Sequence, residues 1–215
     1  MALKVNEIFY SIQGESSYAG RPCVFVRLTG CNLRCSYCDT QYAYDGGDLM
    51  EIGDVLKRVA SYKCPLVEVT GGEPLIQKET PYLIHSLLEA GHEVLLETNG
   101  SQDIRQVDER CVKIMDIKCP TSGEEGKSDL KNLALLADTD EIKFVIGDRG
   151  DYDYAKRVLN SMDLKSVPIS RVHFSPVFGK MDPGLLTKWL LEDHLDVRIH
   201  LQLHKIIWDP EKRGV

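Results

Sequence analysis

The sequence lacks any long apolar run. No stretch approaches the roughly 18 consecutive apolar residues that a transmembrane helix needs. The first seven residues also lack the apolar core of a secretory signal peptide. The seven cysteines are an odd number, which does not suit a secreted disulfide framework. We therefore expect a cytoplasmic chain with reduced thiols and no contact with a membrane.

The sequence is also short of positive charge and of segments that would separate domains. Its formal net charge is −7, which argues against general binding to nucleic acids or anionic membranes. No linker, low-complexity tract or charge run divides the 215 residues, of which 43% are hydrophobic. We expect a single domain over residues 1–215 that acts on a small molecule.

Three of the cysteines, Cys31, Cys35 and Cys38, lie close together with the spacing C-x3-C-x2-C. Clustered thiolates favour zinc, copper(I) or an iron–sulfur cluster. A structural zinc site would need a fourth ligand at zinc-finger spacing, and neither Asp39 nor Cys64 is an obvious one. Three thiolates on a [4Fe-4S] cluster leave one iron open to bind another molecule. The remaining cysteines are expected to be buried bystanders: Cys23, Cys64, Cys111 and Cys119.

Strand-like and helical patterns alternate along most of the chain. Apolar and β-branched runs recur about every 20–30 residues in its second part, and amphipathic helical spacing fills most gaps. Strands are expected over residues 5–10, 23–28, 66–70, 93–97, 112–117, 141–146, 172–174 and 197–203. Helices are expected over residues 52–60, 83–88, 130–137, 154–162 and 185–191, and a loop over residues 41–49.

Strands that alternate with helices in this way imply right-handed parallel βαβ units in a curled α/β sheet. About six parallel strands fall short of the eight that close a complete barrel, which typically takes ~250 residues. The sequence therefore predicts an incomplete, TIM-like βα barrel.

Polar residues gather just after the predicted strands. In barrel-like folds the carboxyl ends of the parallel strands form the active face. The run Thr-Gly-Gly-Glu-Pro at residues 70–74 is one case, and paired glycines let the backbone approach a ligand closely. Similar polar groups stand at residues 97–100, 116–118, 175–176 and 202–204. Inside the second strand, Arg27 is expected on the face opposite to the Val/Leu residues of that strand.

The cysteine spacing, with an aromatic residue just before the third cysteine, resembles that of the radical S-adenosylmethionine superfamily. The Gly-Gly-Glu run at residues 71–73 is similar to a second motif of that superfamily. Motifs along nearly the whole chain narrow the resemblance to the 7-carboxy-7-deazaguanine synthase family. These motifs lie at residues 7–16, 20–22, 25–28, 38–40 and 202–205.

This resemblance implies a radical lyase that converts 6-carboxy-5,6,7,8-tetrahydropterin to 7-carboxy-7-deazaguanine with loss of ammonia, in the biosynthesis of queuosine and other 7-deazapurines. It implies a [4Fe-4S] cluster, S-adenosylmethionine and Mg²⁺ as cofactors. A flavodoxin-like protein would supply electrons, and the chain would form a homodimer. The alternatives are a glycyl-radical enzyme activase, which shares the cysteines but not the N-terminal motif, and a non-catalytic metal-binding module.

The resemblance also implies what particular residues do. Cys31, Cys35 and Cys38 would hold the cluster, and the Thr40 hydroxyl would bind Mg²⁺. The residues expected to contact S-adenosylmethionine are Gly71, Gly72, Glu73, Asn99, Asp116, Ile117, Lys118, Ser175, Pro176, Val177 and Phe178. Those expected to contact the pterin are Ile12, Gln13, Gly14, Glu15, Arg27, Thr70, Glu97 and His204. The predicted catalytic residues are Glu15, Arg27, Glu97 and His204.

Overall fold

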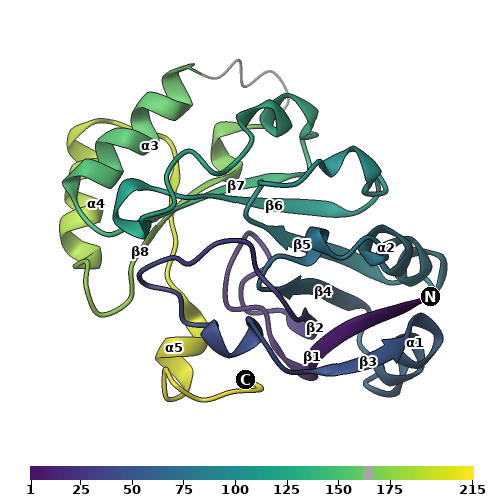
Figure 1. Cartoon of the computed structure of the whole chain (residues 1–215). Coiled ribbons are helices and arrows are strands. Elements are labelled where there is room, and N and C mark those ends of the chain that lie inside the picture. Colours follow the sequence, from purple (N-terminus) through teal and green to yellow (C-terminus); the bar gives the residue numbers. More distant parts are fainter. Residues whose placement is uncertain (162–166) are drawn as a thin grey trace.

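A nine-stranded sheet runs through the computed structural model, which describes residues 1–161 and 167–215 (Figure 1). The strand order is β3-β1-β2-β4-β5-β6-β7-β8-β9. Neighbouring strands are parallel from β2 to β9, whereas β1 pairs antiparallel with both β2 and β3. The strands are β1 (Ala2–Ile12), β2 (Pro22–Leu28), β3 (Asp48–Glu51), β4 (Leu66–Gly71), β5 (Glu93–Thr98), β6 (Val112–Ile117), β7 (Glu141–Ile146), β8 (Val172–Pro176) and β9 (Arg198–Ile199).

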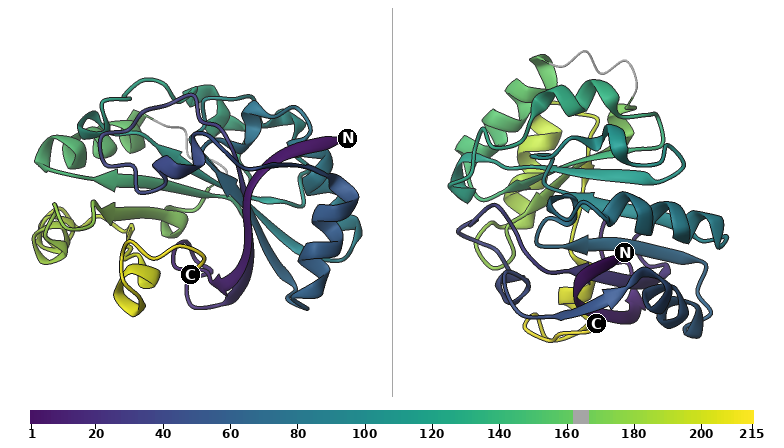
Figure 2. Two further views of the ribbon diagram at one scale, coloured as in Figure 1. Left: turned by 60° about the horizontal axis from the view of Figure 1, so that its bottom comes forward. Right: turned by 45° about the vertical axis from the view of Figure 1, so that its right-hand side comes forward.

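The sheet is curved and open, because β3 and β9 form two separate edges. Its helices are α1 (Ile52–Ser61), α2 (Thr80–Glu89), α3 (Arg149–Ser161), α4 (Pro183–Glu192) and α5 (Leu203–Ile207). Figures 1 and 2 show α1 and α2 beside the first half of the sheet and α3 and α4 beside the second half, with α5 close to the C-terminus. The predicted partial barrel is thereby confirmed. No helix within the described ranges is long and apolar enough to cross a membrane.

Hydrophobic spacing explains the helices that cover the sheet. Helix α1 buries Ile52, Val55 and Val59, which recur at helical spacing on one face. Helix α2 buries Leu83 and Leu87 in the same way, and its chain reverses at the glycine that follows. Both faces join the apolar core on the outer side of the sheet.

The inner side of the sheet is polar near the carboxyl ends of the strands. Successive side chains of a strand point to opposite faces. On β4, Val67 and Val69 therefore pack in the core, whereas Glu68 and Thr70 line a cavity. Parallel pairing sets Thr70 beside the position of Arg27. The inner face thus gathers charged side chains that are far apart in the sequence.

Most predicted elements are found, with shifted ends. The strands expected at residues 112–117 and 141–146 have those bounds. The helix expected from residue 154 begins earlier, at Arg149, and the predicted end at residue 162 lies outside the described residues.

The prediction of a helix over residues 130–137 was wrong in type, since Leu130–Leu135 form a 3-10 helix. The reason is a competing side chain in the middle of the segment. Asn132 is buried, and its amide donates to the carbonyl oxygens of Gly100 at 3.0 Å and Gln102 at 2.7 Å. These tertiary bonds hold the segment against the loop after β5 and outweigh the apolar helical pattern.

Two further sequence predictions need correction. Residues 41–49 are not all loop, because Gln41–Ala43 form a 3-10 turn and β3 begins at Asp48. The strand expected over residues 197–203 is limited to the two residues of β9. Beyond it, the Leu203 amide donates to the Gly14 carbonyl oxygen at 3.0 Å, and α5 begins there.

Candidate active site

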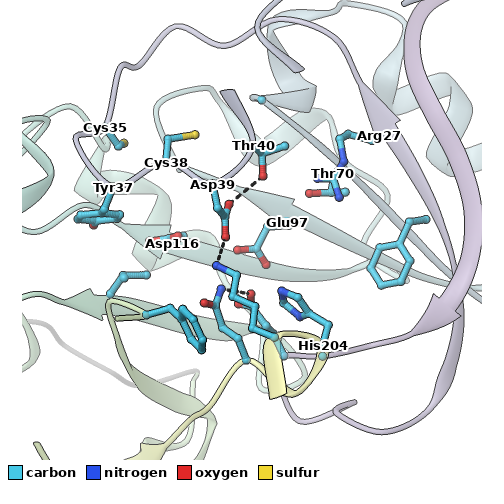
Figure 3. Close-up of a pocket in the computed structure, with 18 of the residues that line it drawn as sticks. Arg27, Cys35, Tyr37, Cys38, Asp39, Thr40, Thr70, Glu97, Asp116 and His204 are labelled. Atoms are coloured by element: carbon cyan, nitrogen blue, oxygen red, sulfur yellow. Dashed lines mark hydrogen bonds and ion pairs between the residues drawn. The ribbon is translucent and has the colours of Figure 1, made fainter. Parts of the chain in front are cut away.

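A cavity of about 650 Å³ opens at the carboxyl ends of the parallel strands (Figure 3). Its wall combines the loop between β1 and β2, the loop that carries the clustered cysteines, the ends of β4 to β7, and the segment from α5 to the C-terminus. Segments from both ends of the chain therefore enclose one space.

The three clustered cysteines all line this cavity. Backbone bonds fix their loop: the Gly30 amide donates to the Ala43 carbonyl oxygen at 2.8 Å, and the Ser36 amide to the Ser122 carbonyl oxygen at 2.9 Å. Burial raises the pKa of the Cys35 thiol to about 11, against the opposing effect of Lys118. A bound metal would lower this pKa instead, since metal coordination deprotonates a thiol.

The ligand-free geometry of these thiols is open. Among the described residues, no three Cys, His, Asp or Glu side chains converge closely enough to hold one metal ion. The donor set nevertheless suits an iron–sulfur cluster, because three partly exposed thiols face one cavity and the other four cysteines are buried elsewhere.

The glycine pair after β4 lies directly against the cysteine loop. A Cβ atom at Gly72 would stand 2.2 Å from the Gly30 carbonyl oxygen and 2.6 Å from Cβ of Cys31. Only glycine permits this approach. The Glu73 amide adds a 2.8 Å bond to the same Gly30 carbonyl oxygen. The predicted cofactor motif and the predicted cluster loop therefore pack directly against each other.

Glu73 itself is fully buried beside the cavity. Its carboxylate accepts bonds from the Leu75 amide at 3.0 Å, the Thr98 hydroxyl at 2.9 Å and the Asn99 amide at 2.7 Å. These bonds join the end of β4 to the end of β5. Its expected contact with S-adenosylmethionine stays a prediction.

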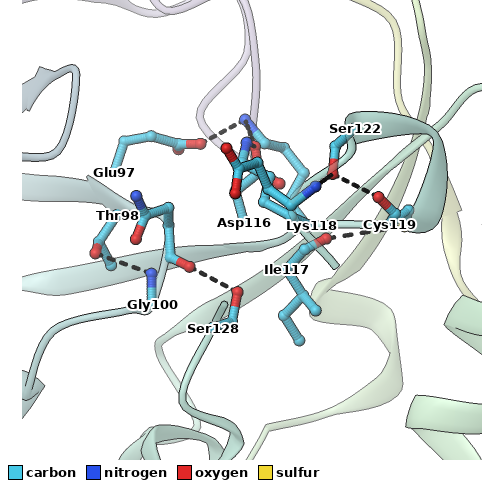
Figure 4. Close-up of polar contacts among 12 residues, drawn as sticks. Glu97, Thr98, Gly100, Asp116, Ile117, Lys118, Cys119, Ser122 and Ser128 are labelled. Carbon is cyan, nitrogen blue, oxygen red and sulfur yellow. Dashed lines mark hydrogen bonds and ion pairs between the residues drawn. The ribbon is translucent and has the colours of Figure 1, made fainter. Parts of the chain in front are cut away.

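The end of β6 brings unsatisfied polar atoms to the cavity. Lys118 Nζ contacts Asp116 Oδ2 at 2.8 Å (Figure 4). Within the described residues, Asp116 Oδ1 and the Tyr37 hydroxyl are buried without a hydrogen-bond partner. Burial of this kind is costly unless a ligand or water supplies the partner. Although burial opposes it, Asp116 keeps the pKa of Lys118 above its usual value.

A lysine that was not predicted from the sequence stands in the middle of the cavity wall. Lys143 Nζ on β7 lies 2.8 Å from Glu15 Oε2 and 3.6 Å from Asp116 Oδ2, and also contacts Glu97 Oε1. Burial opposes the charge of Glu15, but Lys143 outweighs it and holds the pKa of that carboxyl well below its usual range. For Glu97 burial dominates and raises the pKa to about 8.

Arg27 reaches the same cavity from β2. Its Nε donates to Glu7 Oε1 at 2.8 Å, and the Tyr42 hydroxyl donates to the same oxygen at 2.9 Å. The guanidinium carbon also lies 5.7 Å and 5.8 Å from the ring centres of Phe9 and Tyr42. The carboxylate and both rings hold the guanidinium in one orientation.

Helix α5 brings His204 onto the loop between β1 and β2. A Cβ atom at Gly14 would lie 2.1 Å from His204 Nδ1, so the bare glycine backbone makes room for the imidazole. Next to it, the Gln202 amide donates to Glu15 Oε1 at 2.8 Å. Burial lowers the pKa of His204. A neutral imidazole therefore faces the cavity beside Glu15.

The Asp39 carboxylate, at the end of the cysteine loop, already holds a cation. The Thr40 hydroxyl donates to Asp39 Oδ1 at 2.9 Å, and Lys205 Nζ is paired with Asp39 Oδ2 (Figure 3). The ammonium group marks a place where positive charge is stabilised. Hard oxygen donors of this kind suit Mg²⁺.

Most of the predicted site residues line the cavity, and five described residues lie beside its lining instead. The residues in the lining are Ile12, Gln13, Gly14, Glu15, Arg27, Cys31, Cys35, Cys38, Thr40, Thr70, Gly72, Glu97, Asn99, Asp116, Lys118, Val177, Phe178 and His204. Those beside it are Gly71, Glu73, Ile117, Ser175 and Pro176. For example, the Ser175 hydroxyl donates to the His200 carbonyl oxygen at 3.1 Å and is buried.

Several lining residues were missed, chiefly Glu68 and Lys143. The signal for both is a charged residue between two apolar residues of a strand. Glu68 stands between two valines, and Lys143 between Ile142 and Phe144. The last six residues of the chain also line the cavity, and the guanidinium carbon of Arg213 lies 3.8 Å from the centre of the Tyr42 ring.

Comparison with known proteins decides the family. The model of the Radical SAM superfamily matches residues 25–178. The 7-carboxy-7-deazaguanine synthase of Koribacter versatilis is 45% identical and covers 99% of this chain and 100% of that one. The enzyme of that name from Chlorobaculum tepidum is also 45% identical, and the match covers 99% of this chain and 97% of that one. The chain belongs to the 7-carboxy-7-deazaguanine synthase family.

Solved structures agree with this fold. QueE from Escherichia coli has a TM-score of 0.79 at 20% identity, over 95% of each chain. SuiB from Streptococcus suis, bound to S-adenosylmethionine, has a TM-score of 0.56 at 12% identity, over 80% of this chain and 45% of that one.

Family membership confirms the predicted class of reaction. The enzyme is a radical S-adenosylmethionine lyase of 7-deazapurine biosynthesis, and its reaction is a ring contraction. A [4Fe-4S] cluster, S-adenosylmethionine and Mg²⁺ are its cofactors. The activase and the metal-binding module that the cysteines alone left open are not supported by these relatives.

Proposed function

We propose that the single cavity binds S-adenosylmethionine at its cysteine end and 6-carboxy-5,6,7,8-tetrahydropterin at its Glu15 and Glu97 end, and that this chain forms 7-carboxy-7-deazaguanine there with loss of ammonia. The observation that carries the proposal is the continuity of the cavity. It joins the three clustered thiols to a wall of fixed carboxylates without an intervening partition.

The cysteine end has the groups that a cluster and a charged cofactor need. Cys31, Cys35 and Cys38 would hold the cluster, with Gly72 behind them as the close backbone contact. The unpartnered Asp116 oxygen supplies an acceptor for the cofactor. Neighbouring contacts would come from Asn99, Lys118, Val177 and Phe178. When bound, the reduced cluster and S-adenosylmethionine supply the radical that removes hydrogen from the pterin.

The opposite end has the groups that recognise a pterin. Ionised Glu15 can only accept hydrogen bonds. The ring N–H and amino groups of a pterin are donors, so they require an acceptor of this kind. Arg27 presents a planar cation to the pterin carboxylate, which Thr40 and Mg²⁺ would share. Gln13, Thr70 and the remaining lining residues hold the ring in place and exclude water.

The partners and location follow from the same proposal. A flavodoxin-like protein would deliver the electron, and the chain would act as a homodimer in the cytoplasm. The sequence supports the last point through its seven cysteines, an odd number, all of which are free thiols.

An anaerobic assay tests the proposed function. The cluster-loaded enzyme is incubated with 6-carboxytetrahydropterin, S-adenosylmethionine, Mg²⁺ and a chemical reductant, and the product mass is measured. We expect 7-carboxy-7-deazaguanine and ammonia in equal amounts. The matched control is Glu97→Gln, which should retain the cluster and lose product. Product formation without S-adenosylmethionine, or none from a fully loaded enzyme, would refute the proposal.

A further inference from the structure

Glu68 is a carboxyl group in the cavity wall that no predicted function uses. It lies on β4, two residues before Thr70, on the strand face that points into the cavity. Only 6% of the residue is exposed. Within the described residues, the one side-chain hydrogen bond to Glu68 comes from the amide of Gln13. That amide belongs to the loop that also carries Glu15.

Among the residues that the structure describes, no cationic side chain contacts the Glu68 carboxyl group. Lys143 directly contacts Glu15, Glu97 and Asp116. Lys118, which also lines the cavity, is paired with Asp116. These two ammonium groups therefore pair with three carboxyl groups, and neither of them contacts Glu68. Burying an unpaired carboxylate is unfavourable, so this group keeps a proton more readily than its neighbours.

The groups that face Glu68 come from several strands. The carboxylate of Glu15 repels its charge, whereas Lys143 and Arg27 attract it from farther away. Glu97 stays protonated at the pH where Glu68 ionises, because its pKa is about 8. Cys23 on β2 faces it as a neutral thiol, because burial raises the pKa of that thiol. Burial first and Glu15 second raise the pKa of Glu68 to about 7.

We propose that Glu68 is a further substrate-recognition residue, which holds a proton in the free enzyme and releases it when the pterin binds. A pterin presents its amino group and adjacent ring N–H groups as donors, and an ionised carboxylate accepts from both. The O–H bond of Glu68 breaks, its proton passes to water, and the freed oxygens accept the pterin N–H groups. The inference rests on the proposed function, because it places the pterin in this cavity.

Calorimetric titration measures this proton directly. Holoenzyme loaded with S-adenosylmethionine, without a reductant so that no turnover occurs, is titrated anaerobically with 6-carboxytetrahydropterin at pH ~6.5, where most Glu68 carboxyls hold their proton. The titration is repeated in buffers of different ionisation enthalpy, and the slope of heat against that enthalpy gives the protons released. We expect a net release of about half a proton to one proton per site. The release should vanish near pH ~10, where the carboxyl is already ionised.

Variants assign the proton to its residue. Glu68→Gln should bind the pterin more weakly, by about tenfold, and should release at least about a third of a proton less than wild type. The matched control is Glu192→Gln, since Glu192 is an exposed carboxylate of α4. This variant should release as many protons on pterin binding as wild type does. Retained brown colour and unchanged S-adenosylmethionine binding show that each variant is folded, and Glu68→Asp should restore part of the release.

The outcomes separate the two levels of inference. If wild-type holoenzyme does not bind the pterin, the proposed function fails. Pterin binding without proton release at pH ~6.5 overturns the proposal that Glu68 holds a proton in the free enzyme. Release that is the same in wild type and Glu68→Gln overturns the assignment to Glu68.

Discussion

Lys143 Nζ lies 2.8 Å from Glu15 Oε2, across 128 residues of sequence. The pair joins β7 to the loop between the first two strands. The same ammonium group contacts Glu97, so one cation sets the positions of two carboxylates that we assign to pterin recognition. Because Lys143 is buried, it holds these carboxylates more firmly than a solvated lysine would.

The first prediction concerns Lys143→Met. Removing one partner of a buried ion pair leaves unpaired charge and costs about 3–5 kcal/mol when the pair is fully buried. Glu15 is partly open to the cavity, which reduces this cost, so we expect the unfolding midpoint to fall by about 5 °C. The KM for the pterin should rise at least about tenfold, while S-adenosylmethionine affinity stays within about twofold.

The control for this experiment is Lys188→Met, since Lys188 is an exposed lysine on α4. Thermal unfolding and steady-state kinetics are measured for both variants. An unchanged pterin KM in Lys143→Met would show that Glu15 and Glu97 do not depend on this lysine.

The second prediction concerns the cluster ligands. Cys31→Ala, Cys35→Ala and Cys38→Ala should each abolish both the cluster and turnover, because each would remove one of three thiolates. Cys64→Ala is the control, since Cys64 is buried away from the cavity and donates only to backbone carbonyl oxygens. The measurement is visible absorbance and iron content after anaerobic reconstitution, with about four irons per chain expected for wild type. A brown, active Cys35→Ala enzyme would mean that the ligands are misassigned.

The sequence was sufficient for the fold because the fold depends on periodic patterns. Strand and helix spacing alone indicated parallel βα units and too few of them to close a barrel. The prediction failed where one side chain or one contact overrides such a pattern. Asn132 turned a helical pattern into a 3-10 helix, and the docking of Leu203 on Gly14 ended a predicted strand.

The site was predictable to the extent that its residues stand in motifs. The cysteines and residues 13–15 could be found in that way. Glu68 and Lys143 could not, because a charge in a strand does not reveal which side chains of the neighbouring strands it meets until the register of those strands is known. The pairing of β6 with β7 sets Lys143 opposite Asp116, and that long-range register is a property of the folded sheet.

The third prediction concerns Thr40 and Mg²⁺. Thr40→Val keeps the shape of the side chain and removes the hydroxyl that bonds to Asp39. Loss of one oxygen ligand should raise the Mg²⁺ concentration for half-maximal rate about tenfold, with the brown cluster intact. Rate is measured against Mg²⁺ concentration, and Mn²⁺ binding is followed separately by electron paramagnetic resonance. Superimposable curves for variant and wild type would make Thr40 a structural turn residue.

The fourth prediction concerns stability against pH. Burial raises the pKa of Glu68 to about 7 and that of Glu97 to about 8, so the folded chain keeps protons that the unfolded chain has lost. These two groups favour folding most at low pH, and their contribution is lost as pH rises through those values. The pKa of Glu15 is lowered, so Glu15 changes the stability only in acid. Burial lowers the pKa of His200 to about 4, so the effect of His200 on stability lies below pH ~6.5.

The window from pH ~6.5 to ~8 therefore isolates the two raised carboxyls, because the buried thiols contribute only above it, where the cysteines of the unfolded chain ionise. Across it the free energy of unfolding should fall by about 1–2 kcal/mol after allowance for the open cavity. Thermal unfolding of the holoenzyme at a fixed scan rate measures the trend. The double variant Glu68→Gln/Glu97→Gln should show a flatter profile than wild type. Equal slopes would contradict the two raised pKa values.

The last prediction concerns Arg27, which presents its guanidinium to the cavity while its Nε is bonded to Glu7. Lysine keeps the charge but loses the planar fork, the bond from Nε and the stacking on Phe9 and Tyr42. A charge-assisted hydrogen bond is worth about 1.5–3 kcal/mol, so Arg27→Lys should lose about one to two decades in kcat/KM for the pterin.

S-adenosylmethionine binding should barely change in Arg27→Lys, since Arg27 lies beside Thr70 on the far side of β4 from the strands that carry Asn99 and Asp116. The control is cofactor binding measured without the pterin. A second variant, Glu7→Gln, removes the charge that orients the guanidinium and should raise the pterin KM by a smaller factor. If cofactor binding instead collapses while the pterin KM is unchanged, Arg27 serves the cofactor carboxylate, and the two ligands lie in the cavity in the opposite order.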